Sequence, residues 1–155
     1  MTKPKHLILY HTNFGRNDGS PLFYLNAMRD LGMDVTHLKP DGDISQFGSF
    51  SYAWVVDYGE DGLPVDHDWK IPKNCGKTID VASDTHVGEE YRFKKAEGFD
   101  YVFFNQKAAV DEYNETHTNK AVWLPHAAEP KAYPKIKILK KFDVCFVGHV
   151  QETEN

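Results

Sequence analysis

The sequence is poor in cysteine and contains no long apolar run. Its 155 residues include only two cysteines, Cys75 and Cys145, which lie far apart and show no C-x-x-C spacing. Neither a disulfide framework nor a cysteine zinc site is indicated, and a reducing, cytoplasmic setting is expected. No stretch approaches the ~20 apolar residues of a membrane span. The apolar run that follows Lys5 is also too short for a signal peptide.

The sequence also has no excess of basic residues over acidic ones. The formal net charge is −5, which argues against broad binding to nucleic acid or to an anionic membrane. Apolar residues are well represented, at 41% of the chain, and aromatic residues make up 14%. This composition excludes a disordered chain and fits one ordinary domain with a core of its own.

Short apolar runs alternate with helical segments along the chain. The predicted strands cover residues 5–11, 33–40, 51–59, 76–83, 99–105 and 120–125. The predicted helices cover residues 21–31, 84–98 and 106–117. Ser20 is the expected N-cap of the first helix, Gly32 its C-terminal stop, and Asn105 the N-cap of the third. The alternation predicts an α/β fold with a Rossmann-like, doubly wound, mostly parallel sheet.

The chain changes character after the sixth predicted strand. Residues 130–141 carry two prolines and five lysines, and the apolar run 142–147 follows them. We interpret residues 1–129 as one domain, 130–141 as a linker and 142–155 as the first strand of a truncated second domain. Alternatively, the run 142–147 is a seventh strand of the same sheet. The sequence leaves both interpretations open.

Three stretches resemble one family of enzymes. They are DTHVGEEYRFKKAEGFDYVFFNQKAAVDEY from residue 84, KAVWLPHAAEPKAY from residue 120 and KKFDVCFVGHV from residue 140. Their order is similar to that in CgeB-like glycosyltransferases, the spore maturation protein family, which have the two-domain GT-B fold. In that family an acidic residue and a histidine follow a strand. A strand ending in Asn or Gln comes next, then W-L-P-x-A-x-x-P and a strand ending in Val-Gly.

The resemblance covers roughly residues 80 to 150 and implies the N-terminal half of a GT-B fold. The whole enzyme is expected to transfer a sugar from a nucleotide-sugar donor to an unknown acceptor. Nearly all of the nucleotide-binding domain is missing from this sequence, so these residues alone are expected to be inactive. The donor is a substrate, and no cofactor is expected.

Candidate site residues follow the predicted strands, because ligands bind outside the carboxyl ends of strands in open parallel sheets. His11, Asn13 and Gly15 follow the first strand and are candidates for substrate binding. A Gly-containing loop before a helix lets the backbone approach a phosphate, although an ordinary turn is the alternative. Asp84 and His86 follow the fourth strand and are the catalytic candidates, a base and its orienting partner. Asp84 as a plain helix cap is the alternative.

Three more residues are substrate-binding candidates. His126 and Glu129 lie in WLPHAAEP, and His149 follows the apolar run 142–147. They are expected to face the same cleft, and a hydrogen-bonded structural histidine is the alternative for His126. The cluster at residues 66–68, Asp-His-Asp, has no further ligand at a recognisable spacing, so no metal site is expected.

A second function of a different class stays open. The chain would then be a self-contained, non-enzymatic α/β domain that binds a nucleotide, a sugar or a protein partner at the same strand ends. Self-association through an exposed face is also open.

Overall fold

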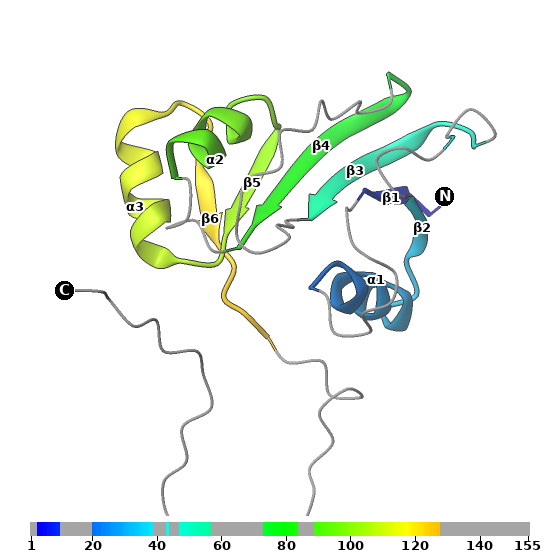
Figure 1. Cartoon of the computed structure of the whole chain (residues 1–155). Coiled ribbons are helices and arrows are strands. Elements are labelled where there is room, and N and C mark those ends of the chain that lie inside the picture. The colour runs from blue at the N-terminus through cyan, green and yellow to red at the C-terminus, as the bar shows by residue number, and fades with distance from the viewer. Residues whose placement is uncertain are drawn as a thin grey trace, which may run out of the picture.

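In the computed structural model of this chain, six strands pair into a parallel sheet. The structure describes residues 3–9, 20–38, 43, 47–56, 73–83 and 89–127. Their strands are β1 (Lys5–Leu9), β2 (Asp34–Leu38), β3 (Phe50–Val56), β4 (Cys75–Ala82), β5 (Tyr101–Phe104) and β6 (Ala121–Trp123). Their helices are α1 (Ser20–Asp30), α2 (Glu89–Ala96) and α3 (Lys107–Thr116). The strand order is β2-β1-β3-β4-β5-β6, and every neighbouring pair is parallel. The predicted Rossmann-like, doubly wound α/β fold is confirmed (Figure 1).

Local sequence signals account for most element boundaries. All six predicted strands are present. The first helix starts one residue earlier than predicted, because Ser20 is its first helical residue and not its N-cap. Gly32 follows α1 with φ of 71°, a left-handed conformation that glycine adopts without strain. The prediction for the third helix was wrong at its first residue. Gln106, not Asn105, is the N-cap of α3, and it makes no side-chain capping bond.

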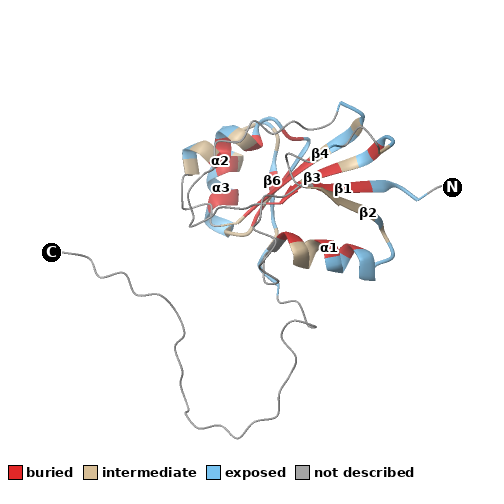
Figure 2. Cartoon of the chain, turned by 45° about the vertical axis from the view of Figure 1, so that its right-hand side comes forward, coloured by how far each residue is buried: buried red, intermediate tan, exposed pale blue. Residues whose placement is uncertain are grey.

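The helices cover opposite faces of the sheet, as the core residues show. Leu7 and Ile8 are consecutive in β1, so their side chains point to opposite faces, and both are fully buried. Leu7 belongs to the core cluster that α2 and α3 cover, whereas Ile8 packs with Leu25 and Met28 of α1. Figure 2 shows the buried side of α1 turned toward the strands. Burial on both faces explains the consecutive apolar residues of the central strands, such as Ala53 to Val56 in β3.

Three aromatic rings pack α2 and α3 against β5. Phe93 of α2 stacks on Phe104 of β5, with ring centroids 5.6 Å apart. Tyr113 of α3 meets both rings edge-on, at 5.2 Å from Phe93 and 5.3 Å from Phe104. Edge-to-face and offset-stacked pairs add to the free energy of burial. This triad therefore fixes both helices over the strand that leads to the candidate site.

A buried ion pair joins α2 to the centre of the sheet. Lys95 Nζ donates to Asp80 Oδ1 at 2.8 Å, and the Asp80 side chain is fully buried in β4. The Lys95 side chain is only 12% exposed. Removing one partner of such a pair leaves the other charge buried, which is far more destabilising than losing a surface pair.

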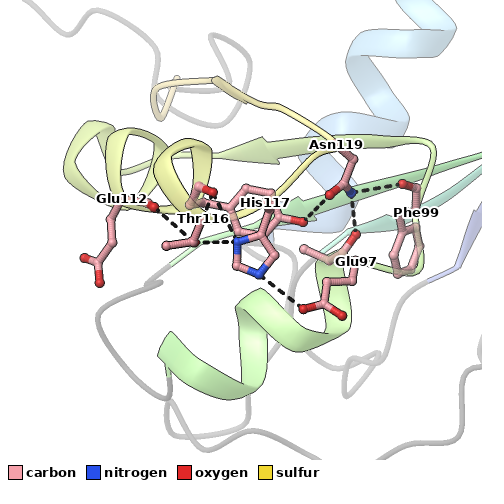
Figure 3. Close-up of polar contacts among 8 residues, drawn as sticks. Glu97, Phe99, Glu112, Thr116, His117 and Asn119 are labelled. Atoms are coloured by element: carbon pink, nitrogen blue, oxygen red, sulfur yellow. Dashed lines mark hydrogen bonds and ion pairs between the residues drawn. The ribbon is translucent and has the colours of Figure 1, made fainter.

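Side-chain hydrogen bonds link the segments at the amino-terminal ends of β5 and β6, which we call the amino-terminal edge of the sheet (Figure 3). The Asn119 side chain precedes β6 and donates to the carbonyls of Ala96 and Phe99, at 3.1 and 3.3 Å. It accepts a bond from the Tyr113 hydroxyl at 2.8 Å. His117, which follows α3, has one ring nitrogen 3.1 Å from the Tyr113 carbonyl and the other 3.2 Å from a Glu97 carboxylate oxygen. These contacts occupy the polar groups of this edge with structural roles.

Replacing Lys95 by Met should lower the free energy of unfolding by about 3 kcal/mol, because the buried Asp80 carboxylate loses its cation. The matched control is Lys94→Met, on the exposed neighbour in the same helix. The control should change stability by less than about 0.5 kcal/mol. Urea unfolding of both variants measures the difference, and equal losses would refute a special role for the Asp80–Lys95 pair.

His6 is a buried histidine whose environment favours the neutral imidazole. It is only 6% exposed and stacks on Tyr52 with centroids 4.9 Å apart. The Trp54 indole N–H donates to His6 Nδ1 at 3.3 Å, which requires an unprotonated Nδ1. Burial lowers the pKa of His6, and the nearby Asp34 carboxylate opposes this only in part. The pKa of His37 is lowered as well, by burial and by the nearby Arg29 charge.

These shifts make the fold sensitive to mild acid. Below the ordinary histidine pKa of about 6.5, the unfolded chain binds protons that the folded His6 does not. The free energy of unfolding therefore decreases as the pH is lowered below that value. Above that pH the contribution is complete. His6→Gln offers an acceptor to Trp54 but does not titrate, and it should show a shallower loss between about pH 7 and pH 5.5. Urea unfolding across this range tests the expectation, and identical pH slopes for both proteins would contradict it.

Candidate functional site

The carboxyl ends of β4, β5 and β6 lie side by side, and we call this row of strand ends the carboxyl edge of the sheet. The register pairs Ala82 with Phe104 and Phe104 with Trp123, which are the last residues of the three strands. Figure 1 shows these ends converging beside the start of α3. Open parallel sheets bind ligands at this edge. It is therefore the place to search for polar side chains with free hydrogen-bonding groups.

Asn105 connects the strand ends at this edge. Its backbone N–H, its carbonyl and its side chain each contact a neighbouring strand end. Its backbone N–H donates to the Ala82 carbonyl at 3.2 Å. Its carbonyl accepts a bond from the Trp123 indole N–H at 3.2 Å. Its side-chain Nδ2 contacts Nε2 of His126. The residue thus ties the end of β5 to the end of β4 and to the segment that follows β6.

His126 lies just beyond β6 and is exposed to solvent. With Asn105 Nδ2 as the donor, Nε2 of the imidazole is the acceptor, and the ring proton is placed on Nδ1. Within the described part of the chain, Nδ1 has no hydrogen-bond partner. The imidazole therefore presents one open N–H to solvent. Such a group can donate to a ligand hydroxyl or carbonyl.

The other end of the Asn105 amide is an unusual feature of this edge. Its Oδ1 is buried and has no hydrogen-bond partner among the described residues. A buried, unsatisfied acceptor destabilises a fold by about 1–3 kcal/mol. Such groups are rare in folded proteins, and each one calls for an explanation. The Asn105 oxygen lies at the end of the sheet where a ligand is expected, whereas the Asn119 amide at the opposite end is fully bonded.

Only one predicted site residue can be placed. His126 lies at the carboxyl edge, where the sequence predicted it. The remaining candidates lie outside the described residues: His11, Asn13, Gly15, Asp84, His86, Glu129 and His149. The structure adds Asn105 and Trp123, which the sequence analysis had not proposed as site residues. The signal was a polar residue directly after an apolar strand, which we had interpreted as a helix cap.

An acidic pair from two helices faces each other at the start of α2. The carboxyl of Glu112 hydrogen-bonds to that of Glu89, which raises the pKa of Glu89, with smaller contributions from burial and like charge. No third ligand joins them: across the described ranges, no group of three or more His, Cys, Asp or Glu side chains is arranged to hold a metal ion. The cluster at residues 66–68 lies outside those ranges. None of the described helices is long and apolar enough to cross a membrane.

Substituting Asn105 should move the proton on His126. The Asn105→Asp carboxylate can only accept a hydrogen bond, so it requires the proton on Nε2 and leaves Nδ1 as an acceptor. Wild-type protein should instead carry the proton on Nδ1. Long-range ¹⁵N–¹H NMR of the histidine rings distinguishes the two tautomers. The same tautomer in both proteins would disprove the assigned Asn105–His126 hydrogen bond.

No family model, no curated protein and no solved structure matches this chain. The parallel α/β fold is thus established by the structure, and the function has to be argued from the geometry of its carboxyl edge together with the sequence resemblance.

Proposed function

We propose that this chain is the N-terminal, acceptor-side domain of a nucleotide-sugar-dependent glycosyltransferase of GT-B architecture. In the reaction, an acceptor hydroxyl oxygen attacks the anomeric carbon of the donor sugar. The bond from that carbon to the diphosphate breaks, the nucleoside diphosphate leaves, and the hydroxyl proton passes to a base. The observation that carries the proposal is the contact between Asn105 and His126 at the carboxyl edge of the sheet.

This contact unites two parts of the sequence pattern that resembles the CgeB-like family. Asn105 ends the strand that precedes the W-L-P segment, and His126 lies within that segment. The two residues are 21 positions apart, yet their side chains meet at the edge where parallel sheets hold ligands. The open Nδ1–H of His126 suits the binding of a hydroxyl-rich substrate. In this proposal His126 positions substrate, while Asp84 and His86 remain the candidates for catalysis.

The outer side of β6, the last strand of the sheet among the described residues, also favours a second α/β unit. Asn114 of α3 accepts a bond from the Ala121 N–H at 2.7 Å and donates to the Ala121 carbonyl at 2.9 Å. Two positions after Trp123, Pro125 has no N–H to offer a neighbouring strand. A seventh strand beside β6 would find few open backbone groups. This favours the assignment of the apolar run 142–147 to a separate domain.

The proposal is tested with the product of the whole reading frame that contains this sequence. It should release nucleoside diphosphate from one member of a panel of UDP-, GDP- and dTDP-sugars in the presence of an acceptor. His126→Ala should lower kcat/KM about tenfold to a hundredfold, because a substrate contact is lost. The matched control is His117→Ala, at the opposite edge of the sheet, which should leave kcat/KM unchanged at a temperature where the protein is folded.

Two outcomes would contradict the proposal. One is robust sugar transfer by the 155 residues alone, since the donor-binding half is then not required. The other is the absence of turnover with every donor while the domain still binds a nucleotide, sugar or peptide. That second result would identify the chain as a non-enzymatic binding domain that uses the same edge.

A further inference from the structure

Trp123 is an unusually exposed aromatic residue for its position. It ends β6 and is 50% exposed, although tryptophan side chains are buried to a high degree on average. Its indole N–H is already bonded to the Asn105 carbonyl at 3.2 Å. The ring is therefore held in one orientation while much of its surface meets solvent. A ring fixed in this way loses little conformational freedom when a ligand stacks on it.

Neither of the polar residues beside this ring, Asn105 and His126, carries a permanent charge. Asn105 bonds to the Trp123 indole through its carbonyl and contacts the His126 imidazole through its amide. Throughout the described ranges, these three residues have no hydrogen bond or ion pair with a charged side chain. Lys107, two positions after Asn105, is paired with Asp111 at 2.7 Å. Lys120, three positions before Trp123, donates to the carbonyls of Asn114 and His117. Nothing in this cluster supplies the fixed cations that a phosphate would select.

An exposed aromatic face beside uncharged donors and acceptors matches a particular ligand chemistry. A pyranose ring has one flat side of C–H groups, which packs on the electron-rich face of an aromatic ring, and a rim of hydroxyls. The Nδ1–H of His126, which shares the partner Asn105 with Trp123, can donate to such a hydroxyl. We propose that Trp123 is the stacking floor of a subsite for a neutral sugar ring, with His126 as its hydroxyl partner and Asn105 as the residue that positions both. This inference rests on the proposed function and specifies the acceptor as a carbohydrate.

The test measures sugar binding by the 155-residue chain itself, without any requirement for catalysis. The probes are methyl β-D-glucopyranoside, methyl α-D-mannopyranoside and methyl N-acetyl-β-D-glucosaminide, with uridine as the nucleobase probe. In saturation-transfer NMR, at least one glycoside should receive saturation mainly on the C–H protons of one ring face. Trp123→Ala should weaken this binding by about tenfold or more, as expected for the loss of a stacked ring. Trp123→Leu retains apolar bulk without a ring and provides a second variant if the alanine variant fails to fold.

The matched control is Val122→Ala, the adjacent β6 residue, which is 54% exposed but points to the other face of the sheet. It should bind the glycoside as the wild type does. The inference is overturned if no glycoside binds, if Trp123→Leu and Val122→Ala bind equally well, or if uridine alone receives saturation. The proposed function is judged separately: glycoside binding without turnover by the full product refutes the transferase only. Turnover that is unaffected by Trp123→Leu refutes the sugar subsite only.

Discussion

Parallel pairing of all six strands is the constraint from which the arrangement of this structure follows. A parallel sheet must be covered on both faces, because its strands are apolar on both sides. It also collects every strand's carboxyl end at one edge, so the two edges can serve different purposes. Within this frame, the buried Asp80–Lys95 pair and the ring triad of Phe93, Phe104 and Tyr113 hold α2 and α3 against β4 and β5. The helices therefore fix the strand ends that present Asn105 and Trp123.

The two edges of the sheet differ in how their polar groups are used. At the amino-terminal edge, the Asn119 amide binds two backbone carbonyls and the Tyr113 hydroxyl, so it is saturated by the protein itself. At the carboxyl edge, one buried oxygen of Asn105 and one ring nitrogen of His126 have no hydrogen-bond partner among the residues that the structure describes. Within the described residues, the Asn119 side chain is fully bonded at the amino-terminal edge, whereas an exposed imidazole N–H is left open at the carboxyl edge. That asymmetry is the physical basis for placing function at the carboxyl edge.

Most of the fold could be predicted from the sequence, because the signals involved are local. Apolar runs separated by turn residues gave all six strands, and Gly32 marked the end of α1. The Asp80–Lys95 pair could not be predicted in this way, since it depends on how a crossover helix lies over its strand. Asn105 illustrates the same limit at the site. A polar residue between a strand and a helix is interpreted locally as a cap, whereas its partners come from the ends of two other strands.

Of the candidate site residues, the sequence predicted the position of His126, while its role stays a prediction. His126 was proposed from its place after an apolar strand, and the structure puts it at the expected edge. Its pairing with Asn105 and the exposed ring of Trp123 are tertiary features, because they depend on the register of β5 with β6. Residues 10–19 and 84–88, which carry other candidates, lie outside the described residues.

The most direct test of this account is a crystal structure of the complete reading-frame product with a nucleotide-sugar and a glycoside acceptor. The account predicts that the carboxyl edge of β4, β5 and β6 faces a second α/β domain across a cleft, and that the acceptor contacts His126 there. A ligand bound at the amino-terminal edge, or a carboxyl edge covered by the protein's own chain, would contradict it.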